Sequence, residues 1–488
     1  MGGVQRTAVG PPGCRMMPAT ESPPALARDA SQTLTAQLVA RYAERIDQRL
    51  LAPGARLPSV RECARRHGVS PSTVVAAYEQ LLARGLVEAR RQRGFFVRPP
   101  RREPSAAAAG GPTPARMAAP VDATALIRGM FHHAAAPSGP GLGTLPPDWL
   151  DLPLLQSALR RSLAPPSRSD ARIYGDPAGD ARLREALVRR LADLGIAAEA
   201  SQIVTTVGAT HALDLVSRTL LQPGDAVLVD EPGWAVEFAR LTHMGMKLLP
   251  VPRGDDGPDL AVMAALARAH RPRLYVTVSV LHNPTGHTLS AASAHHVLRL
   301  AEQHDFHVLE DDTYAWFAPA HAPRLAALDA LQRTIHVGGF SKILAPGWRV
   351  GFAAVPRAWV DRVVDTKLLA TLTTPALLEQ AVAHCLERGL LQRHAERVNA
   401  RLDAARTRTV RLAQAAGCRF VAPPAGLFGW VDVGADTDRL SQALLDEGWL
   451  LAPGPLFHAS RRPSTLMRVN FASAQDARFW QALQRARG

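Results

Sequence analysis

Lysine, cysteine and long apolar runs are all scarce in this chain of 488 residues. No uninterrupted apolar run reaches the length needed to cross a bilayer, which argues against a membrane-spanning protein. The four cysteines form no C-x-x-C pair, so reduced thiols in the cytoplasm are expected rather than a disulfide framework. The pairs His132-His133 and His295-His296 are adjacent and cannot share one face at ligand spacing, so no metal site is predicted.

Only three of the 57 basic residues are lysines, and they are Lys247, Lys342 and Lys367. Arginine stays protonated, whereas a lysine amine can be deprotonated by its surroundings and attack an aldehyde carbon. Lys342 ends the run Gly338–Lys342 and precedes Arg349 by seven residues. This setting predicts a chemical role for Lys342. Lys247 and Lys367 lie in no motif and are expected to be incidental surface residues.

The length and the charge distribution predict several domains, one of which binds a polyanion. A single core rarely extends beyond about 300 residues, so two or three domains are expected. Residues 1–100 hold 15 arginines against 7 acidic residues, more than half of the net charge of +14. The expected parts are a disordered tail without an export signal (1–30), a compact module (31–98), a Pro/Ala/Gly linker (99–122) and a large domain (123–486) with a small subdomain at about 385–486.

The compact module has the pattern of a winged helix-turn-helix. Helical periodicity at Thr33–Leu50 is followed by a capping box at Ser59–Glu62, which begins a short second helix ending at His67-Gly68. Ser70 caps a third helix, and residues 85–88 and 94–97 predict two strands around an Arg-rich turn. The third helix can then enter a major groove. A small helical cap domain with a solvated basic face is the alternative, but it does not explain the hydroxyl groups at the front of the third helix.

The segments 51–61, 68–74 and 77–81 resemble the DNA-binding domain of GntR-family regulators. The resemblance implies contacts to phosphate or base edges from four residues: Arg61, Ser70, Ser72 and Thr73. Two departures are clear. Pro71 stands where the family usually has arginine, and residues 92–96 replace the usual glycine-rich wing.

Beyond the linker, helical patterns alternate with short β-branched runs, which predicts a mostly parallel sheet with helices on both faces. The predicted strands are Gln202–Val207, Ala226–Val229, Leu274–Val280, His307–Leu309, Thr334–Val337 and Val350–Val355. A long helix is expected at Leu377–Ala416, and the small α+β subdomain follows it.

The marked residues of this domain together fit one chemistry, the binding of pyridoxal 5′-phosphate. An aldehyde cofactor needs a lysine that holds it as an imine, and Lys342 qualifies. Its phosphate needs backbone N–H groups at a helix start, which the turn at Ala209-Thr210 offers, and a fixed cation, which Arg349 supplies.

The ring of this cofactor makes three further demands. Its pyridine nitrogen must stay protonated, which requires a carboxylate, and Asp311 at the C-terminal end of a strand is placed for that. Its phenolic oxygen can accept hydrogen bonds from Asn283 and Tyr314. Trp234 supplies an aromatic face.

This set of residues closely resembles fold-type I aminotransferases over about residues 124–486. The resemblance implies that Tyr174 reaches the cofactor phosphate of a partner subunit. It also implies that Arg468 binds the substrate carboxylate and that Gly143 lines the substrate side. Ser341 supplies a phosphate hydroxyl, but Gly339 stands where the related pattern carries a second serine, so weakened cofactor binding is expected.

A winged helix joined by a linker to an aminotransferase-like domain is the layout of the MocR-like subgroup of GntR-family regulators. The resemblance implies a homodimeric transcriptional regulator that binds two half-sites of double-stranded DNA and senses pyridoxal phosphate or an amino-compound effector through the Lys342 imine. One alternative is an active aminotransferase with a DNA-binding extension. A DNA-binding protein with an inactive structural domain is disfavoured by Lys342, Asp311 and Arg349. The complete helix-turn-helix favours the regulator, since an enzyme has no use for it.

Overall fold

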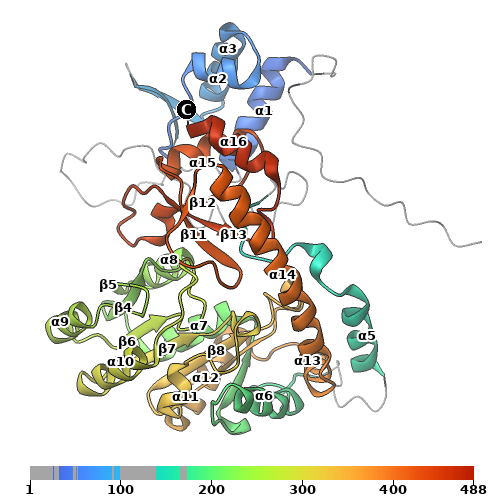
Figure 1. The fold of residues 1–488 in the computed structure, drawn as a ribbon, viewed down its shortest axis with the longest axis vertical. Coiled ribbons are helices and arrows are strands. Elements are labelled where there is room, and N and C mark those ends of the chain that lie inside the picture. Colours follow the sequence, from blue (N-terminus) through green and yellow to red (C-terminus); the bar gives the residue numbers. More distant parts are fainter. Residues whose placement is uncertain are drawn as a thin grey trace, which may run out of the picture.

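The computed structural model describes residues 26, 32–47, 51, 53–90, 93–98, 139–164 and 173–487. The expected linker, the pair His132-His133 and all of the expected tail except Leu26 lie outside the described residues. Within these ranges no helix is both long and apolar enough to span a membrane. Figure 1 shows an N-terminal module at one end, a large α/β domain at the other and a small subdomain between them.

The N-terminal module is a winged helix-turn-helix. Its elements are α1 (Leu34–Asp47), α2 (Val60–His67), α3 (Pro71–Ala83) and the antiparallel strands β1 (Val87–Arg90) and β2 (Gly94–Val97). Its core includes Tyr42 of α1 and Tyr78 of α3, whose rings meet edge to face at 5.9 Å. The three helices and the hairpin predicted from the sequence are therefore confirmed.

Local hydrogen bonds explain where α2 and α3 begin and end. The Ser59 hydroxyl accepts from the Glu62 N–H and the Ser70 hydroxyl accepts from the Thr73 N–H, as predicted for N-caps. Gly68 ends α2 in the left-handed region at φ 63°. The second half of the predicted capping box is wrong, because the Glu62 carboxylate pairs with Arg66 one turn along α2.

The large domain contains a seven-stranded sheet in the order β3-β9-β8-β7-β6-β4-β5. The strands are β3 (Ile203–Thr206), β4 (Ala226–Glu231), β5 (Lys247–Pro252), β6 (Leu274–Thr277), β7 (His307–Asp311), β8 (Thr334–Gly339) and β9 (Gly351–Ala354). Six of these strands run in the same direction, and only β9 runs antiparallel to its two neighbours, β3 and β8. The prediction of a mostly parallel sheet is confirmed, although β5 had not been predicted.

Helices cover both faces of this sheet. They are α6 (Ala181–Asp193), α7 (Ala209–Leu220), α8 (Ala235–His243), α9 (Leu260–His270), α10 (Ala291–Gln303), α11 (Leu325–Asp329) and α12 (Val360–Thr371), whereas α5 (Leu152–Leu163) packs against α13 (Ala376–Glu387). One apolar cluster joins α7, α8 and α12 to the sheet, and another joins α9 and α10 to it. Because six of the strands are parallel, their carboxyl ends lie at one edge of the sheet, which is where ligands of such sheets bind.

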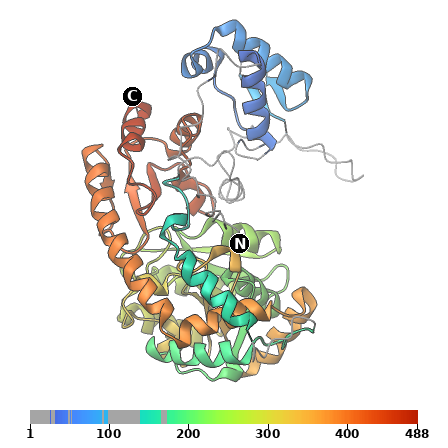
Figure 2. The same ribbon diagram turned by 90° about the vertical axis from the view of Figure 1, so that its right-hand side faces the viewer.

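The small subdomain has a four-stranded antiparallel sheet in the order β10-β11-β13-β12. Its strands are β10 (Arg419–Phe420), β11 (Phe428–Asp432), β12 (Ala452–Pro453) and β13 (Leu466–Asn470), and its helices include α15 (Thr437–Asp446) and α16 (Ala477–Arg487). The single long helix predicted before it is wrong. Gly389, at φ 60°, separates α13 (Ala376–Glu387) from α14 (Leu390–Ala415), which runs along the subdomain in Figure 2.

The prediction that Lys367 is an incidental surface residue is also wrong. Its side chain on α12 is completely buried, and the amine donates to the hydroxyls of Thr205 and Thr374, each at 3.3 Å. Burial lowers the pKa of Lys367 to about 8. Lys247 is exposed, as expected.

Candidate functional site

Lys342 lies three residues beyond the end of β8, at the edge where the parallel strands open. Its amine donates a hydrogen bond of 2.8 Å to the carbonyl oxygen of Gly143. Desolvation in the pocket, followed by the repulsion of Arg468, lowers the pKa of Lys342 to about 8. The neutral amine that attacks an aldehyde is therefore available close to physiological pH.

Asp311 is the last residue of β7, and its side chain faces the pocket. The flanking carboxylates point to the other face of the sheet, where Asp312 accepts from Arg324 at 2.6 Å and Glu310 accepts from the backbone N–H groups at the start of α11. The alternation of side chains along a strand thus selects one carboxylate of three. Asp311 accepts from the hydroxyl and the N–H of Thr313, and burial raises the pKa of Asp311 to about 6.

The start of α7 forms an anion-binding cradle with Arg349. The backbone N–H groups of Ala209 and Thr210 are the first two of the helix, where hydrogen-bond donors and the helix dipole favour negative charge. Arg349 donates to the Ser341 hydroxyl at 2.9 Å. The N-cap of α7 is Gly208 at φ 76°, and a Cβ atom there would lie 2.4 Å from the Arg349 guanidinium. The arginine therefore approaches the helix start only because that residue is glycine.

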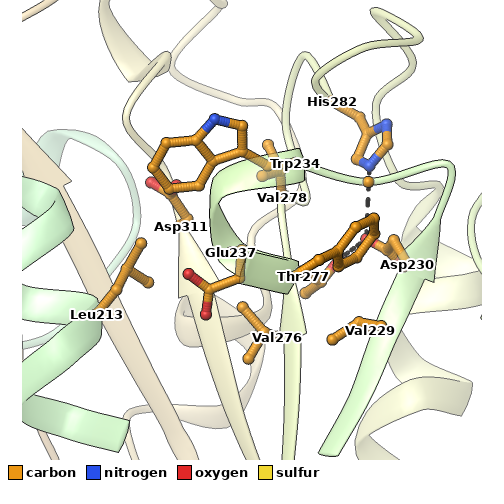
Figure 3. A pocket seen from close by; sticks show the side chains of 12 residues that line it. Leu213, Val229, Asp230, Trp234, Glu237, Val276, Thr277, Val278, His282 and Asp311 are labelled. Carbon is orange, nitrogen blue, oxygen red and sulfur yellow. Dashed lines mark hydrogen bonds and ion pairs between the residues drawn. The ribbon is translucent and has the colours of Figure 1, made fainter. Parts of the chain in front are cut away.

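Figure 3 shows Trp234 beside Asp311 at one end of a pocket, with His282 and Asp230 at the other end. Trp234 precedes α8 directly, so its indole stands over the carboxyl ends of the strands. Burial lowers the pKa of His282 well below its ordinary value, which keeps this ring neutral. The indole and the Asp311 carboxylate thus offer a ring face and a negative charge on the same side of the pocket.

Asn283 and Tyr314 are buried and joined by a hydrogen bond of 3.3 Å from the amide to the phenol oxygen. The Asn283 amide oxygen accepts from Arg468 of β13 at 3.1 Å. The two predicted ring-contacting residues therefore lie next to the predicted carboxylate-binding residue.

Arg468 is buried, and its guanidinium is held on several sides. It donates to the carbonyl oxygen of Gly141 at 2.7 Å, two residues from the carbonyl that accepts from Lys342. The rings of Phe428 and Phe457 lie 4.3 and 5.3 Å from it. Burial lowers the pKa of Arg468 to about 10, and its Nε atom is buried with no hydrogen-bond partner among the described residues. Such a donor fits a carboxylate that approaches from the pocket.

Three of the four predicted DNA-contacting residues, Ser70, Ser72 and Thr73, lie together at the start of α3. Arg61 is exposed on α2, and the exposed hydroxyl of Ser72 lies 2.7 Å from that of Ser70 at the start of α3. The Ser70 hydroxyl also contacts that of Thr73 at 2.8 Å. Tyr174, in contrast, makes no hydrogen bond with the pocket residues within the part of the chain that the structure describes, and it is 78% exposed.

Four residues near the site were not found from the sequence. Thr313 holds the Asp311 carboxylate, Glu237 lies in the same pocket as Asp311, and Phe428 and Phe457 flank Arg468. Thr313 follows Asp311 by two residues, a spacing typical of a carboxylate that accepts from its own turn. No local motif marks the other three.

Comparison with known families agrees with this architecture. The model for aminotransferase class I and II matches residues 151–485, well over half of the chain. The chain belongs to the class I and II aminotransferase family. Residues 34–97 of this family member match the model for bacterial regulatory proteins of the gntR family, so its N-terminal module is a DNA-binding domain. The two domains together have the MocR-like layout that the sequence predicted.

Similar proteins include both regulators and enzymes. The uncharacterized HTH-type transcriptional regulator YdcR of Escherichia coli strain K12 is 29% identical over 460 residues, covering 92% of this chain and 97% of its own. The 2-aminoadipate transaminase of Thermus thermophilus is 28% identical over 286 residues, 56% of this chain and 71% of its own. The crystal structure of LysN, the alpha-aminoadipate aminotransferase of Thermus thermophilus, has a TM-score of 0.67 at 26% identity and covers 74% of this chain and 94% of its own.

The fold and these relatives imply pyridoxal phosphate as the cofactor of this aminotransferase-family chain, and the residues present fit that group. Gly351 lets β9 pack directly against the turn before α7, since a Cβ atom there would lie 2.6 Å from the Gly208 backbone, and this packing positions the helix start beside Arg349. Lys342, with its lowered pKa, can react with the aldehyde of this cofactor. The buried Asp311 carboxylate can pair with its pyridine nitrogen, and the Trp234 indole can stack on its ring.

Proposed function

We propose that this protein is a DNA-binding transcriptional regulator whose aminotransferase-like domain senses pyridoxal 5′-phosphate or an amino compound that reacts with it. One observation carries the proposal. A complete winged helix-turn-helix is joined in one chain to a site in which Arg468, Asp311 and Arg349 act electrostatically on Lys342. An enzyme alone gains nothing from the first part, and a DNA-binding protein alone gains nothing from the second.

In this proposal each pocket residue has one task toward the cofactor. When bound, the cofactor supplies an aldehyde that condenses with primary amines and a pyridine ring that withdraws electrons. Lys342 offers the amine, and Asp311 holds the proton on the pyridine nitrogen. The backbone N–H groups of Ala209 and Thr210, together with Ser341 and Arg349, would bind the phosphate. Trp234 would cover one face of the ring, and Asn283 and Tyr314 would donate to its phenolic oxygen.

The effector that the pocket suits is a primary amine that also carries a carboxylate. The Arg468 Nε donor is buried and has no hydrogen-bond partner among the described residues, and a guanidinium donor of this kind pairs well with a carboxylate. The rings of Phe428 and Phe457, 4.3 and 5.3 Å away, help to hold the guanidinium in place. The relatives named as transaminases of 2-aminoadipate and of aromatic amino acids support the same class of compound.

We further propose a homodimer. Tyr174 and its neighbour Ile173 are 78% and 72% exposed, and Leu369 at the end of α12 is 91% exposed. Large apolar side chains exposed to this extent favour a protein–protein interface. In such a dimer Tyr174 would reach the partner's phosphate site. Two DNA-binding modules would then contact two half-sites of one operator.

The test is a DNA-binding experiment combined with a spectroscopic screen. The protein, loaded with pyridoxal phosphate, is expected to retain one promoter fragment specifically in a gel shift, with an affinity that falls steeply as salt rises. Amino compounds that change its visible spectrum are expected to change this affinity. Efficient turnover of amino donors with no specific DNA site would instead favour an aminotransferase with an extension.

A further inference from the structure

A carboxylate of the small subdomain pairs with two arginines of the DNA-binding module. Asp446, the last residue of α15, pairs through one oxygen with Arg45 of α1 and through the other, at 2.8 Å, with Arg66 of α2. Arg45 also donates to the carbonyl oxygen of Leu445 at 3.1 Å. Only 8% of the Asp446 side chain is exposed, against 12% for Arg45 and 22% for Arg66. We call this set of four residues the α15 contact.

The position of Asp446 explains why the module binds there. The C-terminal end of a helix is the negative end of its dipole, and its last carbonyl groups lack partners within the helix. A carboxylate at that end is unfavourable unless cations lie close to it. Arg45 and Arg66 supply two, and the hydrogen bond to Asp446 raises the pKa of Arg66 although burial opposes it. The negative charge at the end of α15 therefore favours binding of a pair of arginines.

Helix α15 also packs against the strand that carries Arg468. Leu440 and Leu444 of α15 are buried against Met467 and Val469 of β13, the strand that carries Arg468. At its other end, the Thr437 hydroxyl accepts from the N–H of Gly454 at 3.2 Å.

Gly454 begins the 3-10 turn Gly454–Phe457, whose last ring lies 5.3 Å from the Arg468 guanidinium. A displacement of β13 or of this turn would therefore move α15 and the carboxylate at its end.

We propose that the end of α15 is the docking site of the chain's own DNA-binding module, and that it transmits occupancy of the Arg468 pocket to that module. The docking itself rests on the α15 contact. The transmission also rests on the proposed function, because it requires a ligand in the pocket. In Figure 1 the lower end of α1 lies next to α15, in agreement with the ion pairs of Asp446.

Docking at this site leaves the DNA-contacting face open. Arg61 and Arg66 are five positions apart on α2, so their side chains point about 140° apart around the helix axis. Arg66 faces α15, whereas Arg61 and the start of α3 at Ser70 are exposed. The docked module can thus meet DNA while it is held in one orientation. In a dimer this would set the separation of the two DNA-contacting helices.

The docking is tested on the full-length chain with Asp446→Asn, which removes the charge and keeps the size. The matched control is Glu447→Gln, since Glu447 is the next residue and pairs with Arg485 inside the small subdomain at 3.1 Å. Small-angle X-ray scattering is expected to show a larger radius of gyration for Asp446→Asn and an unchanged one for the control. Arg45→Gln should reproduce the effect from the module side, with an unchanged circular dichroism spectrum showing that the variants fold. An Asp446→Asn variant as compact as the wild type would overturn the proposal.

Transmission is tested by the ratio of DNA affinities measured with and without pyridoxal phosphate. The probe is a duplex selected from a random-sequence library by the wild-type protein. The wild type and Glu447→Gln are expected to show a ratio that differs from one, and Asp446→Asn a ratio close to one with cofactor uptake unchanged. Equal ratios in wild type and Asp446→Asn would overturn transmission. A wild-type ratio of one would refute the sensor in the proposed function, while the scattering result would still decide the docking.

Discussion

Replacing Gly339 with serine, the residue that the related pattern carries there, should strengthen cofactor binding. Gly339 is the last residue of β8, and a Cβ atom there would lie 3.4 Å from the Ala209 nitrogen, 3.5 Å from the Ala209 Cβ and 3.7 Å from the Val350 oxygen. These are ordinary contacts, so a side chain fits without displacing its neighbours. A serine hydroxyl would stand next to the start of α7, where the proposed phosphate binds. A hydrogen bond to a charged group contributes about 1.5–3 kcal/mol, and some of this is lost in ordering the side chain.

We therefore expect Gly339→Ser to lower the dissociation constant of pyridoxal phosphate about tenfold, which corresponds to about 1.4 kcal/mol. The matched control is Gly339→Ala, which adds the same Cβ atom without the hydroxyl. The assay is a titration of the cofactor-free protein with pyridoxal phosphate, followed by the visible absorbance of the adduct. Affinities that are equal in the serine and alanine variants would refute the placement of the phosphate at α7.

Three further outcomes are expected. The rate of cofactor capture should rise with pH and level off above about 8, because only the neutral Lys342 amine attacks and burial lowers its pKa to that value; a rise that continues toward pH 10 would contradict this. Asp311→Asn should weaken cofactor binding about tenfold or more in the same titration, because the pyridine nitrogen loses its buried anion, and an unchanged affinity would refute the role. Leu81→Ala, at a fully buried position of α3, should destabilise the DNA-binding module by about 2–5 kcal/mol in chemical unfolding while the visible band persists. A loss below about 1 kcal/mol would show that Leu81 is not in that core.

Local chemistry made much of the fold predictable from the sequence. The N-caps Ser59 and Ser70 and the left-handed Gly68 mark helix ends through hydrogen bonds and backbone angles within a few residues. The β-branched runs likewise predicted six of the seven strands of the large sheet, with ends that differ by a few residues. β5 (Lys247–Pro252) was missed because it contains two prolines and lies at the sheet edge, where proline is tolerated.

Tertiary packing made the rest unpredictable. Lys367 lies in no motif, and its burial against Thr205 and Thr374 depends on how α12 meets β3. The aromatic rings that flank Arg468 come from segments separated by about 30 residues, so no local pattern joins them. The pairing of Asp446 with Arg45 spans about 400 residues of sequence. For the candidate site, the sequence predicted the residues that would contact a ligand. It did not predict those that position them, such as Thr313, Phe428 and Phe457.

The most direct test of the proposed sensor is to detect covalent attachment of pyridoxal phosphate to Lys342. The full-length protein is incubated with pyridoxal phosphate, reduced with borohydride and digested, and the peptides are analysed by mass spectrometry. We predict an adduct on the Lys342 nitrogen that is absent from Lys342→Ala, together with a DNA affinity that responds to the cofactor in the wild type and not in the variant. An unmodified Lys342 peptide, or a variant whose DNA affinity responds as the wild type does, would contradict the central claim.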